Sequence, residues 1–393
     1  MKGQAVAILA AVAMLAAGSG HAGGPAASPC QSALPRARLD LPAPVIVTTS
    51  CGRFHLGPAG RVVYLGPRTL PVPRGASYWA DLTWTRFARG HLLVGRGHQQ
   101  LWRSHRTYPH TYPANIGVVV LGRHELAFSY YRGRRPLLYL ARYGANERAL
   151  TGGELPLVFL RSGEFVTWRD RGGALVLRTA SGRVERLIAP HAANPLVDRR
   201  GTILFRVADR LRVFDGHRVR SLASLRSLGL TGQPLIELLG RLVAVRNERL
   251  LVVLDLDGRR LASTRLPQRR RPVDMVSSPV VANPAGTAVA FAAARGTTAY
   301  GSRGRETVYL LRAGQGQAQP LYSERLQFKG CERTANLAWH GHWLLYSTTE
   351  ERAAVIDTSL QAQPVELNNL IARLPGAHRS DDAVFDASWD TWH

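Results

Sequence analysis

The chain has 393 residues and a formal net charge of +24, from 51 lysine and arginine residues against 27 acidic ones. This length exceeds what one compact core usually fills, so it favours a closed or repeated architecture over a single globular core. The positive field favours anionic partners such as cell-wall polymers or lipid headgroups, and the alternative is a solvated basic surface with no specific partner.

Residues 1–22 have the pattern of a signal peptide. Lys2 precedes an apolar run over residues 5–17, and small residues follow up to Ala22. The run is shorter than the roughly 20 apolar residues of a membrane span. We therefore predict export to a secreted or periplasmic location, with cleavage near Ala22; an uncleaved N-terminal anchor is the alternative. An exported protein seldom meets nucleic acid, so no nucleic-acid partner is expected.

The mature chain is predicted to begin with a flexible lead-in over residues 23–38, which are rich in Gly, Ala, Pro and Ser. No later stretch approaches 18 consecutive apolar residues, so no transmembrane segment is expected in the mature chain. Residues 39–393 are then a single domain, which we expect to be a monomer. The domain opens with three short β-type runs separated by Gly and Pro, at residues 45–49, 53–56 and 61–65.

A turn followed by a strand of alternating apolar residues recurs along the rest of the chain. It is clearest at Asn283–Phe291, and a second strand follows at Thr307–Leu311. The pattern starts at residues 90, 124, 163, 201, 240, 286 and 341, which are 34, 39, 38, 39, 46 and 55 residues apart. These steps are in the range of one four-stranded propeller blade, about 40–50 residues. Few segments have a helical period; residues 221–230 and 365–374 are the candidate short helices.

The repeats predict an all-β fold, a β-propeller of seven or eight four-stranded blades. One further strand is expected after the seventh repeat, at residues 383–389. With the three strands at the N-terminal end it makes a complete blade, which closes the ring and removes the free sheet edges that invite aggregation. This pairing of the two ends favours eight blades.

The layout resembles the TolB-type β-propeller family, whose repeats carry a Ser-Pro-Asp-Gly turn, a strand of the Ile-Ala-Phe kind and an Asp-x-Asp-Gly turn. Asn283–Gly286 with Val289–Phe291 matches the first half, with Ala285 in place of the usual aspartate. Leu254–Gly258 matches the second half in another repeat. The resemblance covers most of residues 78–370 and implies a propeller; the fold alone does not imply a function.

Three cysteines in an exported protein suit one disulfide and one remaining thiol. Cys51 lies near the N-terminal strands and Cys331 just before the last repeat, so a closed ring makes them neighbours. We predict a Cys51–Cys331 disulfide, with Cys30–Cys51 as the alternative. No CxxC or other metal-ligand spacing is present, so neither a metal site nor a cofactor is predicted.

Residues 78–112 are the richest stretch in aromatic, histidine and arginine side chains. Aromatic faces beside arginine forks suit a sugar, an aromatic ligand or an anionic polymer. The candidate ligand-binding residues are Trp79, Trp84, Arg86, Trp102, His105 and Tyr108. The alternative is that the aromatic side chains fill the cores between blades while the arginines face water.

These features favour a binding module for a protein, a glycan or an anionic envelope polymer. No Gly-x-Ser-x-Gly motif is present, so a serine-hydrolase elbow is excluded and no catalytic residue is predicted. The rival hypothesis is a lyase or hydrolase that acts on an anionic polysaccharide at the ring centre. A converging set of His, Tyr, Asp or Glu with Arg at one mouth of the channel would favour that enzyme. A structural module within a larger assembly is a third possibility.

Overall fold

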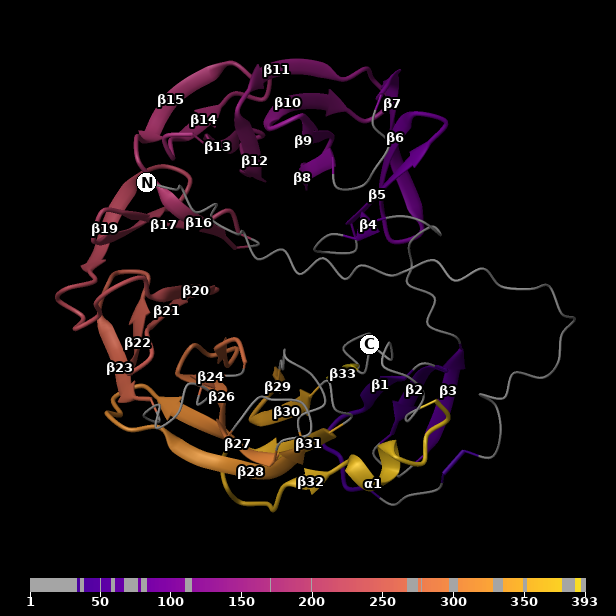
Figure 1. The fold of residues 1–393 in the computed structure, drawn as a ribbon, viewed down its shortest axis with the longest axis vertical. Helices are drawn as coiled ribbons and strands as arrows, with labels where there is room; N and C mark the ends of the chain where they lie inside the picture. The colour runs from indigo at the N-terminus through magenta and orange to yellow at the C-terminus, as the bar shows by residue number, and fades with distance from the viewer. Residues whose placement is uncertain are drawn as a thin grey trace, which may run out of the picture.

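The strands assemble into eight antiparallel sheets placed around a common centre, as the computed structural model shows (Figure 1). The structure describes residues 34–35, 39–49, 51–57, 61–66, 77–78, 83–109, 115–169, 171–198, 200–266, 275–276, 278–296, 303–327, 335–348, 352–376 and 386–389. Within these ranges one short helix, α1 (Asn368–Ile371), accompanies the strands. The predicted all-β propeller is therefore confirmed, with eight blades.

We number the sheets as blades 1–8 in chain order. Blade 1 contains β1 (Val45–Thr49), β2 (Gly52–Leu56), β3 (Val62–Gly66) and β33 (Asp386–Trp389). Blade 2 contains β4 (Ser77–Tyr78), β5 (Thr83–Ala88), β6 (His91–Arg96) and β7 (Gln99–Thr107). Blade 3 contains β8 (Ile116–Leu121), β9 (Glu125–Arg132), β10 (Arg135–Arg142) and β11 (Arg148–Gly152). Blade 4 contains β12 (Glu154–Phe159), β13 (Phe165–Arg169), β14 (Leu175–Arg178) and β15 (Val184–Ala189).

The second half of the chain repeats this plan. Blade 5 contains β16 (Ala193–Val197), β17 (Ile203–Val207), β18 (Arg210–Phe214) and β19 (Val219–Ser224). Blade 6 contains β20 (Leu235–Leu239), β21 (Leu242–Arg246), β22 (Leu250–Asp255) and β23 (Arg260–Arg265). Blade 7 contains β24 (Met275–Val276), β25 (Val281–Ala282), β26 (Ala288–Gly296), β27 (Arg303–Arg312) and β28 (Gln319–Gln327), and both β24 and β25 pair with β26. Blade 8 contains β29 (Ala335–His340), β30 (Trp343–Thr348), β31 (Arg352–Asp357) and β32 (Val365–Glu366).

Blade 1 joins the two ends of the chain, as the sequence predicted. β33 pairs with β1 in antiparallel register, from Val45 opposite Trp389 to Thr48 opposite Asp386. The C-terminal strand thus supplies the innermost strand of a blade whose other three strands come from the N-terminal end (Figure 1). Residues 383–385, the start of the predicted closing strand, lie outside the described residues.

The first repeat was placed one strand too late in the sequence. Counted outward from the ring centre, the turn leads into the second strand of the blade in six of the seven repeats. The strand after Gly90 is instead β6, the third strand of blade 2. The second strand of that blade is β5, whose run of Thr, Trp, Arg and Phe hides the apolar alternation. This misplacement explains why the step from residue 90 to 124 is the shortest of the series.

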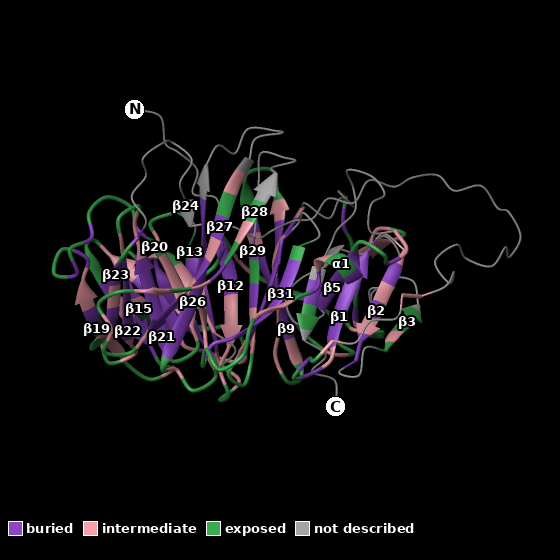
Figure 2. Cartoon of the chain, turned by 90° about the horizontal axis from the view of Figure 1, so that it is seen from below, coloured by how far each residue is buried: buried purple, intermediate pink, exposed green. Residues whose placement is uncertain are grey.

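The core is divided among the junctions between blades. Seven hydrophobic clusters each combine the facing sheets of two neighbouring blades, because strands that are buried on both faces pack against a sheet on either side. Figure 2 shows these buried strands edge-on, with the exposed residues gathered at the turns. Within the described ranges, no such cluster joins blades 1 and 2.

The two candidate helices had different outcomes. Helix α1 occupies the middle of residues 365–374, so that prediction is confirmed in part. The prediction of a helix over residues 221–230 is wrong, because β19 takes its first residues to complete the outer edge of blade 5 and turns follow. Among the described helical residues there is no helix with the length and apolarity of a membrane span. Cys30 and Cys331, the two candidate partners of Cys51, lie outside the described residues, so the predicted disulfide stays a prediction.

Candidate functional site

The structure describes five of the six candidate ligand-binding residues and divides them between two places in the fold. Trp84 is 1% exposed, lies across Gly95 and donates its indole N–H to the carbonyl of Gly97 at 2.8 Å. Arg86, two residues further along β5, is half-buried on the same face of the sheet. Trp79 lies outside the described residues. Trp84 lies opposite Gly95 and Trp102 lies opposite Val94, so Trp84 and Arg86 are on the other face of blade 2 from Trp102.

Trp102, His105 and Tyr108 come together at the junction of blades 2 and 3. Trp102 is buried against Phe128 of blade 3, with ring centroids 5.6 Å apart, and its indole N–H donates to the carbonyl of Ala145 at 2.9 Å. Tyr108 is buried in the same hydrophobic cluster, whereas His105 is exposed. Trp102 and Tyr108 thus fill a core between two blades, and Trp84 is buried within blade 2; the predicted role of all three in ligand binding stays a prediction.

A groove of about 540 Å³ opens at this junction, between β7 and the turn that joins β10 to β11. Its walls combine polar side chains with apolar surface. The lining residues are His91, Gln100, Leu101, Trp102, Arg103, Ser104, His105, Gly144, Ala145 and Asn146. The volume is in the usual range for small-molecule sites, roughly 300–1,000 Å³.

Glu147 fixes the shape of the groove from behind. Its carboxylate is 4% exposed and accepts the backbone N–H groups of His105 and Arg106, each at 2.9 Å. Because β7 is the outermost strand of blade 2 and Glu147 belongs to blade 3, these two bonds tie one blade to the next. Hydrogen bonds to an ionised acceptor are the stronger kind, so the tie is a firm one.

His91 has a defined tautomer. Its Nδ1 lies 2.9 Å from the carbonyl oxygen of Ser104, and a carbonyl only accepts, so Nδ1 carries the proton. In the neutral ring Nε2 is then an acceptor, and His91 is among the residues that line the groove. The neighbouring Ser104 hydroxyl is fully used, since it accepts from the N–H of Leu92 at 2.8 Å and donates to the carbonyl of Arg106 at 2.7 Å.

The groove can recognise hydroxyl and acidic groups. Gln100 and Asn146 offer both donors and acceptors, and Arg103 offers an exposed guanidinium. No carboxylate is among the described residues that line the groove. Within the described part of the chain, no group of three or more His, Cys, Asp or Glu side chains is placed to hold a metal ion.

The ring centre offers fewer chemical groups. The innermost strands carry three acidic or histidine side chains with a described position, Glu154, Glu237 and His340, and each comes from a different blade. The carboxylate of Glu237 forms an ion pair with Arg246 at 3.3 Å and accepts the backbone N–H of Val280 at 3.1 Å. Burial raises the pKa of Glu237, and Arg246 opposes the rise. Among the described residues these three do not converge on one mouth of the channel.

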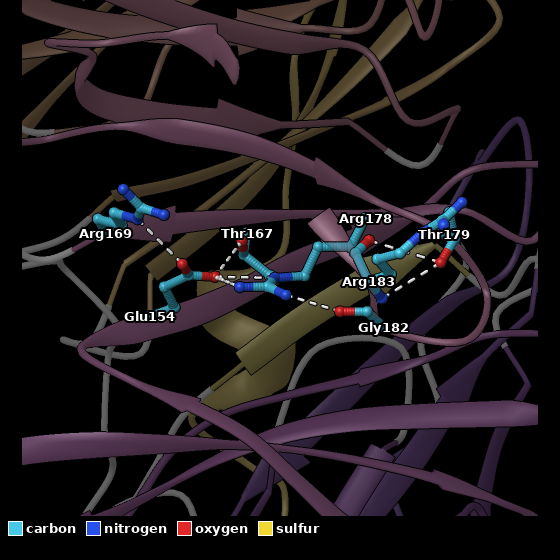
Figure 3. A network of polar contacts seen from close by, with 7 residues as sticks. All are labelled: Glu154, Thr167, Arg169, Arg178, Thr179, Gly182 and Arg183. Carbon is cyan, nitrogen blue, oxygen red and sulfur yellow. Dashed lines mark hydrogen bonds and ion pairs between the residues drawn. The ribbon is translucent and has the colours of Figure 1, made fainter. Parts of the chain in front are cut away.

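Glu154 would be the strongest catalytic candidate, because it is a buried carboxylate on an innermost strand. Figure 3 shows instead that its oxygens are satisfied within blade 4. It accepts the hydroxyl of Thr167 at 2.7 Å and pairs with Arg178 at 2.9 Å and Arg169 at 3.0 Å. Arg178 in turn donates to the carbonyl of Gly182 at 2.6 Å. A carboxylate so fully paired stabilises the blade and has no oxygen left for a substrate.

Of the candidates named from the sequence, Trp102 and His105 line the groove, whereas Glu147 and Asn146 were not among the candidates. The aromatic and arginine density of residues 78–112 pointed to the first pair. Glu147 lies 42 residues from His105 in the chain, and only the packing of blade 3 on blade 2 brings them together.

Fold and site together define an eight-bladed β-propeller with a polar groove on its outer edge. No protein-family model matches the sequence, and no curated protein sequence matches it either. Among solved structures it is similar to apo AztD from Citrobacter koseri, with a TM-score of 0.46 and 8% identity, covering 82% of this chain and 95% of that chain. It is also similar to the computationally designed protein Ika8, with a TM-score of 0.45 and 12% identity, covering 82% of this chain and 98% of that chain. It is similar as well to BamB from Moraxella catarrhalis, with a TM-score of 0.41 and 15% identity, covering 74% of this chain and 83% of that chain. Likeness at these scores says nothing about a ligand or an activity.

Proposed function

We propose that the chain is an exported binding module, and that the groove between blades 2 and 3 holds an acidic glycan of the cell envelope. The observation that carries the proposal is the composition of the groove wall. Arg103, Gln100, Asn146 and His91 line a volume of about 540 Å³ without a carboxylate among the described lining residues. Sugar hydroxyls need both donors and acceptors, and a sugar carboxylate needs the guanidinium.

A glycan fits this groove better than a peptide strand does. Peptides commonly bind an outermost strand such as β7 by adding a further strand through main-chain hydrogen bonds. Here the N–H groups of His105 and Arg106 are already bonded to Glu147, so part of that edge is occupied.

The net charge of +24 supports an acidic ligand. A field of this sign raises the rate at which anions reach the surface, and salt screens it over about 8–10 Å. Binding at a specific site should therefore persist at high salt concentration, whereas attraction to a generic basic surface should be lost. This difference separates the proposal from the alternative of a solvated surface without a partner.

The enzyme at the ring centre remains the rival from a different class. It would need titratable groups beyond the paired Glu154 and Glu237. Its signature would be cleavage of an acidic polysaccharide, which the binding assay detects as loss of the probe. The third possibility, a structural module in an assembly, would show no affinity for any glycan.

Export, the resemblance to TolB-type propellers and the disulfide belong to the same proposal. Two motif turns support the resemblance: the side chain of Asn283 accepts the N–H of Thr287 at 2.8 Å, and that of Asp255 accepts the N–H of Asp257 at 2.9 Å. Such bonds stabilise tight turns before and after a strand. We propose Cys331 as the partner of Cys51, which peptide mapping of the oxidised mature protein tests.

The test is binding of the purified mature chain, residues 23–393, to acidic and neutral oligosaccharides and to envelope fractions at about 0.15 M and about 0.5 M salt. We expect one acidic glycan to bind at both salt concentrations. Asn146→Ala should weaken it by about 3–10-fold, because a neutral hydrogen bond contributes about 1 kcal/mol. Binding that vanishes in high salt for every probe would contradict the proposal.

A further inference from the structure

Two arginines face each other directly at the tip of the β9–β10 hairpin. Arg132 and Arg135 are cross-strand partners, and both are exposed, as is Arg134 in the turn between them. Like charges directly opposite each other on a sheet are destabilising. Within the described part of the chain none of the three forms an ion pair, so no carboxylate there relieves the repulsion.

The pair continues one face of blade 3 that is turned toward blade 2. Side chains alternate along a strand, so Arg132 shares its face with Tyr130 and Phe128. Phe128 lies opposite Tyr139 on β10, with the two rings stacked 5.1 Å apart. This face is a column of aromatic rings that ends at the arginine pair.

Blade 2 adds two more arginines at the same end of the column. The backbone N–H of Tyr108 donates to the carbonyl of Gly90 at 2.8 Å, which holds the end of β7 beside the β5–β6 hairpin tip. Arg89 is exposed at that tip, and Arg106 is exposed two residues before Tyr108. Burial raises the pKa of Tyr139, and both Arg106 and Arg132 oppose the rise. Arg106 of blade 2 and Arg132 of blade 3 thus both lie near the hydroxyl of Tyr139.

The Tyr108 hydroxyl is buried at this point and has no hydrogen-bond partner among the residues that the structure describes. The Tyr108 side chain is 6% exposed, and its ring packs on Tyr130 and Tyr139 with centroids 4.7 and 5.9 Å away. Burial raises its pKa, and Glu147 and Tyr139 raise it further, so the hydroxyl is a neutral donor at physiological pH. Buried polar groups are nearly always paired, so an unpaired one requires an explanation.

We propose that Arg106, Arg132 and Arg135 bind a phosphate group, with the Tyr108 hydroxyl as an additional donor once Arg106 moves onto the anion. The negative charge removes the repulsion between Arg132 and Arg135. Each guanidinium can donate two parallel hydrogen bonds to a pair of phosphate oxygens. A phosphate offers more charge and more acceptors than a single carboxylate, which suits arginines that approach from two blades. The site uses different residues from the groove and stands whether or not the groove binds a glycan.

The phosphate has two possible sources that share this chemistry, a phosphodiester polymer of the envelope and a phospholipid headgroup. The probes are inorganic phosphate and glycerol phosphate, measured by calorimetry at constant ionic strength, and vesicles of phosphatidylglycerol against phosphatidylcholine. Binding of the soluble probes alone indicates a polymer, and binding of the phosphatidylglycerol vesicles as well indicates a headgroup. Either result supports the phosphate site, and binding of no phosphate probe overturns it.

The variants separate this site from general electrostatic attraction. Arg132→Gln with Arg135→Gln should weaken phosphate binding by at least about 10-fold, since each charged contact is strong. The matched control is Arg171→Gln with Arg249→Gln, which removes two exposed arginines from hairpin tips of blades 4 and 6 on the same rim. The control should stay within about twofold of the native affinity. Equal weakening in both pairs would overturn the proposal.

Tyr108→Phe distinguishes a binding role of the hydroxyl from a structural one. Because the hydroxyl has no partner among the described residues, its removal should leave the melting temperature unchanged or raise it. Phosphate affinity should fall by about 3–10-fold in the same variant. A lower melting temperature with unchanged phosphate affinity would show that the hydroxyl serves the core alone, and would overturn its assignment to the site.

Discussion

Glu147→Gln tests whether a single buried carboxylate holds blades 2 and 3 together. The native side chain accepts two backbone N–H groups from β7, each at 2.9 Å, and is 4% exposed. Glutamine keeps one acceptor oxygen but turns an NH2 group toward the other N–H, which leaves one buried donor without a partner. A hydrogen bond to a charged group contributes about 1.5–3 kcal/mol, so the variant should lose about that much stability.

The assay is thermal unfolding followed by circular dichroism. Domains of 150–250 residues shift by about 2–4 °C per kcal/mol, and a longer chain shifts less, so we expect a fall of about 2–6 °C. Glycan affinity should fall as well, because the same two bonds set the course of β7 along the groove. The control is Asp40→Asn, which removes one exposed carboxylate. A melting temperature within about 1 °C of the native protein for Glu147→Gln would refute the reasoning.

Three further predictions follow from the fold. Deleting residues 381–393 removes β33 and uncovers the edge of β1, so the whole ring should lose stability, by more than about 5 °C in melting temperature; unchanged unfolding would contradict closure of the ring. Gly95→Ala places a Cβ atom 2.1 Å from the indole of Trp84, and should cost at least about 1–3 kcal/mol in chemical denaturation. Gly316→Ala, where an added Cβ meets nothing within 4 Å, is its control, and equal stability of the two variants would argue against the packing of Trp84 on Gly95. Burial raises the pKa of Asp357, but hydrogen bonds from Ser359, Ala362 and Gln361 outweigh burial and hold the pKa below its usual value. The stability that this carboxylate contributes is therefore present at neutral pH and is lost as the pH falls below about 4. Below that pH, Asp357→Asn should reduce the slope of the free energy of unfolding against pH by up to about 1.4 kcal/mol per pH unit. A slope as steep as that of the native protein would count against this assignment.

The sequence predicted the propeller because its local signals agree with one another. Apolar alternation, hairpin turns and a regular spacing all indicate short antiparallel strands. The closing blade was also predictable, since three strands before the repeats and one after them complete a sheet. The first repeat was misplaced because Thr83–Ala88 mixes Thr, Trp and Arg and does not read as a strand buried on both faces.

The site was predictable only in part. The density of aromatic and arginine residues over 78–112 pointed to Trp102 and His105, but it also selected Trp84 and Arg86, which face the other way. Which face a side chain takes depends on strand register, and the bulges within β7 shift that register. Glu147 and the opposed arginines of the β9–β10 hairpin depend on contacts between blades or across strands, which a single sequence does not reveal.

The most direct test of the account is a calorimetric titration of the acidic glycan into the native mature chain, Arg103→Ala and Arg241→Ala at about 0.5 M salt. Arg241 is an exposed arginine at the tip of a blade 6 hairpin, far along the chain from the groove, so the two variants lose the same charge. The account predicts that Arg103→Ala weakens binding by at least about 10-fold while Arg241→Ala binds like the native protein. Equal affinity of the two variants would contradict a specific site in the groove between blades 2 and 3.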